Sequence, residues 1–184
     1  MTTRIATPVT IETAPAAARP LLHGVEAKLG SAPNLFRVVA NSPAALEGYL
    51  GLNGALGKGS LDARTRERIA LAVAEFNGCG YCLSAHTYLG KNLAGLSDAE
   101  IAANRRGGSS DARAAAAVAF AVKVVEARGH VSDADVGAVK LAGYGDAEII
   151  EIVAHVALNT LTNYVNEVAQ TEIDFPVVNA RSAA

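Results

Sequence analysis

The sequence predicts an all-α protein. Apolar residues recur at helical spacing along most of the chain, and Ser, Asp, Pro and Gly stand where helices typically start and end. β-branched residues gather only near the two ends, so no strand pattern is expected. A length of 184 residues suits one domain spanning residues 1–184, without repeats or a dividing linker.

The chain begins with an arm and two helices. Residues 1–14 combine Pro8 with alternating β-branched residues, and this pattern predicts an extended arm. Residues 17–30 carry leucine and valine at helical spacing and end at Gly30, a residue typical of helix ends. A short helix is expected within residues 31–41.

The two helices that follow carry clear boundary signals. Ser42 is a favourable N-cap, and Pro43 suits the first helical position. Ser60 or Asp62 caps the next helix, which ends at Gly78 after an asparagine. Because Cys79 follows at once, these signals predict a tight turn into another helix.

The second half of the chain is expected to be helical as well. Further helices are predicted within residues 79–95, 97–107, 109–129 and 132–145, and from Asp146 onward. Ser97 and Glu100 have the spacing of a capping box. Between Ile149 and Leu161 the last helix is apolar nearly all round, which predicts burial on several sides or at a subunit interface.

Composition excludes several classes of protein. The chain is 51% hydrophobic and 18% charged, which is typical of a soluble globular protein and too apolar for disorder. A net charge of −2 and a pI of about 6.1 give no reason to expect nucleic acid or an anionic membrane surface as partner. No apolar run is long enough to span a membrane, and the first residues lack a signal-peptide pattern, so we expect a cytoplasmic protein.

The only two cysteines, Cys79 and Cys82, lie three positions apart, and His86 follows the second by four. On a helix the three side chains project within an arc of about 60°. The helix dipole favours a thiolate at Cys79 in the first turn, whereas His86 can take the proton of Cys82. The alternative is that both cysteines pack in a core and the histidine bonds a carbonyl.

Glu67 is the fourth residue of interest. If the two helices form an antiparallel hairpin, Glu67 and His86 stand level, each about 12–16 Å from the bend. Glu67 falls on an apolar stripe, whereas Arg64, Arg68 and Glu75 form a stripe expected to face water. A carboxylate on the apolar face needs a partner, and pairing with His86 would orient the ring and raise its basicity. Pairing with Arg64 or Arg68 on the surface is the alternative.

Glu67, eleven residues, Cys79-Gly80-Tyr81-Cys82, three residues and His86 together resemble the core motif of the alkylhydroperoxidase D-like (carboxymuconolactone decarboxylase) family. The stretches "PNLFRVVANSPAALEGYLGLNGAL" and "LNTLTNYVNEVAQTEIDFP" are similar to its peroxidase-related branch. The resemblance therefore covers most of the chain.

The resemblance implies an all-α fold around a helical hairpin, here residues 61–95, assembled into trimers or hexamers. It implies that Cys82 attacks a hydroperoxide, that Cys79 resolves the sulfenic acid to a disulfide, and that an external dithiol reduces the pair. Glu67 and His86 would form the proton relay, with no cofactor or metal. The best-known members have a second histidine between the cysteines, where this chain has Tyr81, a poor base at neutral pH.

Three other interpretations remain open. Cys79, Cys82, His86 and Glu67 are acceptable zinc ligands, although structural zinc sites usually draw thiolates from separated loops. A decarboxylase-like or lactone-processing enzyme would use His86 as acid–base and leave the dithiol idle. A non-catalytic oligomeric scaffold would keep only the fold.

Some polar residues of the last helix have a structural interpretation. His155 lies in an apolar stretch and is expected to be a core or interface residue. Asn159 and Asn163 share a face, and Asn166 follows near the end of the helix; buried amides need partners. We expect these asparagines to pin an interface or to cap the neighbouring hairpin.

Overall fold

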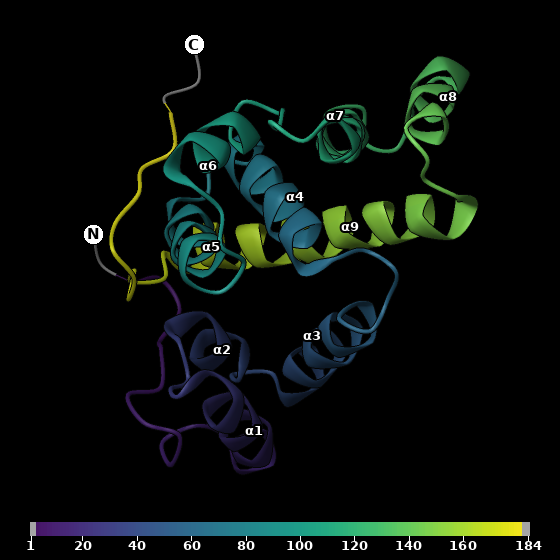
Figure 1. Cartoon of the computed structure of the whole chain (residues 1–184). Helices are drawn as coiled ribbons and strands as arrows, with labels where there is room; N and C mark the ends of the chain where they lie inside the picture. Colours follow the sequence, from purple (N-terminus) through teal and green to yellow (C-terminus); the bar gives the residue numbers. More distant parts are fainter. Residues whose placement is uncertain (1–2, 182–184) are drawn as a thin grey trace.

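A computed structural model describes residues 3–181, and within this range the chain is all-α, as predicted (Figure 1). These residues form nine α-helices and one short 3-10 helix, η1, and no strand. The bounds are η1 Ala16–Ala18, α1 Arg19–Leu29, α2 Asn34–Val39, α3 Pro43–Leu56, α4 Ala63–Phe76, α5 Gly80–Asn92, α6 Asp98–Asn104, α7 Ala112–Glu126, α8 Asp133–Leu141 and α9 Asp146–Ala169. No helix in the described range is both long and apolar enough to cross a membrane.

Helix boundaries follow the local signals of the sequence. Ser42 and Asp62 are the N-caps of α3 and α4, and each side chain accepts a hydrogen bond from the backbone three residues on. Gly30 and Gly78 end their helices with φ of +80° and +71°, a conformation that side chains other than glycine rarely adopt. These signals fix where the chain turns.

Helix α4 is the centre of the fold. It packs against α5, α7 and α9, and α9 crosses behind it in Figure 1. The Asn77–Gly78 turn reverses the chain directly into α5, so α4 and α5 form the predicted hairpin. Its core side is lined by Leu71, Ala74, Cys79, Cys82 and Leu83, which are all buried.

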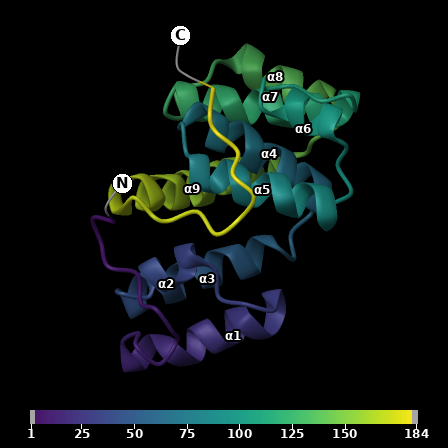
Figure 2. The ribbon, with the colours of Figure 1, turned by 90° about the vertical axis from the view of Figure 1, so that its left-hand side faces the viewer.

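Helices α1, α2 and α3 form a separate layer beneath α5 and α9 (Figures 1 and 2). Leu22 and Leu46 anchor the core of this layer. Residues 3–14 contain neither helix nor strand, and Thr10 and Thr13 close a turn within them. The first two residues of the predicted arm lie outside the described range.

After α9 the C-terminal segment, residues 171–181, runs back along α5 without regular structure (Figure 2). Its backbone is held by side chains of the hairpin: the amide N–H of Val178 donates to Ser84 Oγ at 2.9 Å. Arg181 donates to the carboxylate of Glu75 on α4 at 2.9 Å. The segment therefore forms one wall of the region around α5.

Two predictions about charged residues were wrong. Ser97 caps α6, but the Glu100 carboxylate accepts from Arg68, Ser109 and Ser110 instead of closing a capping box. Arg68 therefore lies buried in an ion pair and does not belong to a wet stripe. The Glu75 carboxylate is also largely buried, between Arg105 and Arg181. Sequence spacing gave no sign of these distant partners.

Candidate active site

The two cysteines stand at the first turn of α5. Cys79 is its N-cap, and its Sγ accepts a hydrogen bond from the backbone N–H of Cys82 at 3.3 Å. Both are free thiols, and their exposed fractions are 0% for Cys79 and 2% for Cys82. The turn thus brings the two thiols together in a nearly dry environment.

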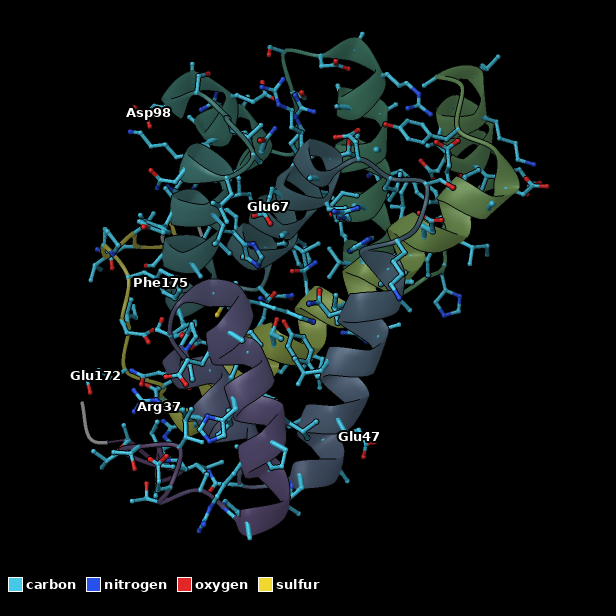
Figure 3. The ribbon with its side chains drawn as sticks, turned by 60° about the horizontal axis from the view of Figure 1, so that its bottom comes forward. Arg37, Glu47, Glu67, Asp98, Glu172 and Phe175 are labelled. Carbon is cyan, nitrogen blue, oxygen red and sulfur yellow. The ribbon has the colours of Figure 1, made fainter. Side chains whose placement is uncertain are left out.

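Glu67 and His86 face each other across the hairpin, as the helical register predicted. His86 Nδ1 lies 2.9 Å from Glu67 Oε2, and both side chains are 22% exposed. Figure 3 shows the labelled Glu67 side chain between α4 and α5, whereas Glu47 projects from α3 away from the molecule. Burial disfavours a charged imidazole, but the charge and hydrogen bond of Glu67 outweigh it and raise the pKa of His86.

The surroundings shift the pKa values of the two thiols in opposite directions. The pKa of Cys82 is lowered from 9.0 to about 6, chiefly because the Cys79 thiol donates a hydrogen bond to its sulfur. Burial opposes this shift, and the positive charge of His86 supports it. The same hydrogen bond, followed by burial, raises the pKa of Cys79. Cys82 therefore has the lower pKa of the two thiols, whereas the helix dipole alone would give the lower pKa to Cys79.

Helix α9 contributes two groups that sequence reasoning did not assign to the site. Asn166 Nδ2 donates to Cys82 Sγ at 3.3 Å, and Asn163 also lowers the pKa of Cys82 through its side chain. Asn163 Oδ1 accepts from Asn77 Nδ2 at 2.8 Å, so it caps the hairpin as predicted. The sequence predicted that Asn163 and Asn166 are buried amides that need partners, but it did not show that they lie beside Cys82.

A family model described as the carboxymuconolactone decarboxylase family matches residues 43–127, which contain the whole hairpin. A peroxidase-related protein of Ralstonia eutropha JMP134, described as an alkylhydroperoxidase AhpD core, superposes with a TM-score of 0.82 at 25% identity over 95% of this chain and 94% of its own. Residues 43–127 of the chain therefore belong to the carboxymuconolactone decarboxylase family. Among curated proteins, none matches it.

Two other solved structures share the fold of this chain. A peroxidase-related protein of Silicibacter sp. TM1040 is 26% identical over 94% of this chain and 90% of its own, with a TM-score of 0.76. The debrominase Bmp8 is 22% identical over 95% of this chain and 94% of its own, with a TM-score of 0.78. Proteins with this fold therefore include at least one enzyme whose named reaction is not peroxide reduction.

The tyrosine between the cysteines of this chain is a structural residue. Tyr81 is buried; its hydroxyl donates to Asp174 Oδ1 at 2.7 Å and accepts from the backbone N–H of Leu35 at 3.0 Å. Burial is the main cause that raises its pKa, so the hydroxyl stays neutral. Tyr81 therefore ties α2 and the C-terminal segment to α5.

A cavity of about 530 Å³ opens beside this pair, and His86 and Ala85 belong to its lining. Tyr49 of α3 lines it too; burial, then the nearby negative charges of Cys82 and Glu67, raise the pKa of its hydroxyl. Tyr49 is a third residue that sequence reasoning did not assign to the site. Within residues 3–181 no group of three or more His, Cys, Asp or Glu side chains is arranged to hold a metal ion.

Proposed function

We propose that the chain is a thiol-dependent peroxidase that reduces hydroperoxides through Cys82 and Cys79, with Glu67 and His86 as proton relay. The observation that carries this proposal is the setting of Cys82: a buried thiol whose sulfur accepts a hydrogen bond from Asn166 Nδ2 at 3.3 Å and which shares its helix face with His86. These groups and the Cys79 thiol lower its pKa. A low pKa supplies a thiolate at neutral pH, and the thiolate is the nucleophilic form. A purely structural pair of cysteines would have no need of it.

In the first step the Cys82 thiolate attacks the terminal oxygen of ROOH. An S–O bond forms, the O–O bond breaks, and the leaving alkoxide takes the proton of the His86 imidazolium to give ROH. Cys82 is then a sulfenic acid, and His86 is neutral. Glu67 stabilises the imidazolium before the step and holds its ring in place.

In the second step the Cys79 thiol attacks the Cys82 sulfur; an S–S bond forms, the S–O bond breaks, and water leaves with the Cys79 proton. The main cause that raises the pKa of Cys79 is its hydrogen bond to the Cys82 sulfur. Oxidation of Cys82 to the sulfenic acid removes the negative charge of its sulfur. Cys79 therefore becomes easier to ionise at the step in which it reacts. Its N-cap position then favours the thiolate.

The disulfide must be reduced from outside, and we infer an external dithiol or thiol protein as the donor of two electrons. The cytoplasm, which keeps thiols reduced, suits this cycle. The net reaction converts ROOH and a dithiol into ROH, water and a disulfide.

The direct test is peroxide consumption with dithiothreitol by wild type, Cys82→Ser and Cys79→Ser. We expect Cys82→Ser to lose activity, and Cys79→Ser to stop after one turnover with Cys82 as sulfenic acid. Counting free thiols after equimolar peroxide should show two lost together in wild type. Unchanged thiols would contradict the proposal and favour a scaffold, or a decarboxylase-like enzyme that uses only His86.

A second candidate is reductive dehalogenation of an aromatic ring. One structure of Bmp8 is a complex with 2,3,4-tribromopyrrole, and aromatic side chains line the cavity beside His86. The dithiol would again supply two electrons: the carbon–halogen bond is replaced by carbon–hydrogen, halide leaves, and a disulfide forms. Halide release from a bromopyrrole, without peroxide consumption, would favour this candidate.

We also infer that the chain forms a homo-oligomer, a trimer or hexamer. The outer face of α9 exposes Ile150, Val153, Leu161, Tyr164 and Val168, an apolar stripe along the helix. Leu161→Glu should shift the native mass towards the monomer, whereas Leu141→Glu, at an exposed leucine of α8, should not. A wild-type monomer would refute this inference.

A further inference from the structure

Aromatic side chains concentrate at one place in this protein. The chain has five tyrosines, four phenylalanines and no tryptophan. Five of these nine line the cavity beside His86: Phe36, Tyr49, Tyr81, Tyr88 and Phe175. More than half of the few aromatic residues in this chain therefore surround one cavity. They leave that cavity open, so filling the core does not explain why they are gathered there.

The five side chains come from two parts of the fold. Phe36 of α2 and Tyr49 of α3 contact each other with ring centroids 5.8 Å apart. Phe175 of the C-terminal segment lies 5.9 Å from the Tyr81 ring, edge-on, and 5.9 Å from the Tyr88 ring. Figure 3 shows Phe175 beside α5. The rings are thus already held in aromatic contacts, and their orientation is fixed before anything binds.

The cavity also has a suitable size and a reactive end. Its volume of about 530 Å³ lies within the range of small-molecule sites. Ala85 and His86 line it, and both stand one helical turn from Cys82. Neither cysteine belongs to the lining, so a ring held among the aromatic walls would meet the site through the His86 side of the cavity, one helical turn from Cys82.

We propose that this cavity binds a planar aromatic ring, and that the substrate of the dithiol is an arylalkyl hydroperoxide. This inference rests on the proposed peroxidase function and names its substrate class. The reaction converts the arylalkyl hydroperoxide into the arylalkyl alcohol and water while Cys79 and Cys82 become a disulfide. Aromatic walls favour a ring with a quadrupole over a saturated ring of equal size.

Binding of the product alcohol tests the inference without any turnover. Reduced wild-type protein is titrated by calorimetry with 2-phenylpropan-2-ol and with 2-cyclohexylpropan-2-ol, which has the same skeleton but a saturated and more hydrophobic ring. We expect the phenyl compound to bind about tenfold more tightly, a difference of about 1.4 kcal/mol. Equal binding, tighter binding of the cyclohexyl compound, or no binding of either would overturn the inference.

Two variants assign the preference to the cavity. Tyr88→Leu removes a half-exposed ring from the wall and should reduce the phenyl preference to about threefold or less. Phe76→Leu changes an exposed ring at the end of α4 that does not line the cavity, and should keep the preference. A preference that survives Tyr88→Leu and is lost in Phe76→Leu would refute the site.

Peroxide assays separate this inference from the proposed function. If the phenyl preference is present but no hydroperoxide is consumed, the peroxidase proposal fails and the aromatic site stands. If hydroperoxides are consumed with equal kcat/KM for cumene hydroperoxide and its cyclohexyl analogue, the peroxidase proposal stands and the aromatic substrate class fails.

Discussion

Asn166 and Cys82 are 84 positions apart in the chain, yet the amide Nδ2 of Asn166 donates a hydrogen bond to Cys82 Sγ at 3.3 Å. The contact joins α9 to the start of α5, and Asn166 is 2% exposed. A hydrogen bond to a buried anion is worth more than one to a neutral group, because water cannot replace it. Asn166 therefore stabilises the thiolate form of Cys82 from outside the hairpin motif.

Asn166→Ala should raise the pKa of Cys82 by about one pH unit, since hydrogen bonds to charged groups contribute about 1.5–3 kcal/mol. The pH dependence of Cys82 alkylation by iodoacetamide, followed by mass spectrometry, measures the shift. Asn53→Ala, at an exposed asparagine of α3, is the matched control and should leave the profile unchanged. An unchanged profile in Asn166→Ala would contradict the role of this contact.

In the wild type the alkylation rate of Cys82 should rise with a midpoint near pH 6, because its pKa is lowered from 9.0 to about 6. A thiol whose folded pKa is depressed adds stability that is complete above its unfolded pKa and is lost as the pH falls through the folded value. The protein should therefore lose this stabilisation between about pH 9 and pH 6. In Cys82→Ser the hydrogen bond to the Cys82 sulfur, the main cause that raises the pKa of Cys79, is gone, so Cys79 should be alkylated at a lower pH than it is in wild type. A Cys82 midpoint near 9 would exclude the proposed thiolate.

Glu67→Gln keeps the shape of the side chain and removes its charge, so the pKa of His86 should fall. Peroxide turnover at neutral pH should drop about tenfold or more, because less imidazolium is present to protonate the leaving alkoxide. The alkaline limb of the pH–rate profile, set by His86, should move to lower pH, which a merely structural defect would not cause.

Glu47→Gln makes the same chemical change on the outer face of α3 and should leave both rate and profile as in wild type (Figure 3). If the two variants behave alike, Glu67 does not act through His86.

Local signals were enough to predict the helices and the hairpin from the sequence. Caps such as Asp62 and turn glycines such as Gly78 act within a few residues, so their effect can be read from neighbours in the chain. The Glu67–His86 pairing followed from the same source, because a tight turn fixes the register of two helices. The pattern from Glu67 to His86 lies within one hairpin, and sequence reasoning could reach all of it.

What the sequence did not reveal depends on contacts between distant segments. Asn166 reaches Cys82 from α9, and Tyr49 reaches the cavity from α3. Side-chain periodicity tells which face of a helix is buried, but not which residue of another element it meets. The charged residues Arg68 and Glu75 were assigned to water for the same reason, since their partners come from later parts of the chain.

Arg68 and Glu100 give a stability test of that correction. Arg68 Nε donates to Glu100 Oε1 at 2.8 Å, and the two side chains are only 10% and 6% exposed. The carboxylate also accepts from Ser109 and Ser110, and these hydrogen bonds outweigh burial and lower the pKa of Glu100. Removing the guanidinium leaves a buried carboxylate without its counter-charge, and such changes cost about 3–5 kcal/mol.

Arg68→Met should therefore lower the free energy of unfolding by about 3 kcal/mol, measured by urea denaturation followed by circular dichroism. Lys91→Met breaks an ion pair of similar length with Asp98, but those side chains are 55% and 77% exposed, so water screens the interaction. Its cost should stay within about 0.5 kcal/mol. Equal losses in the two variants would mean that burial adds nothing to the Arg68–Glu100 pair. A larger loss for Arg68→Met that shrinks as the pH is lowered and the Glu100 carboxylate is protonated would assign the difference to the buried carboxylate.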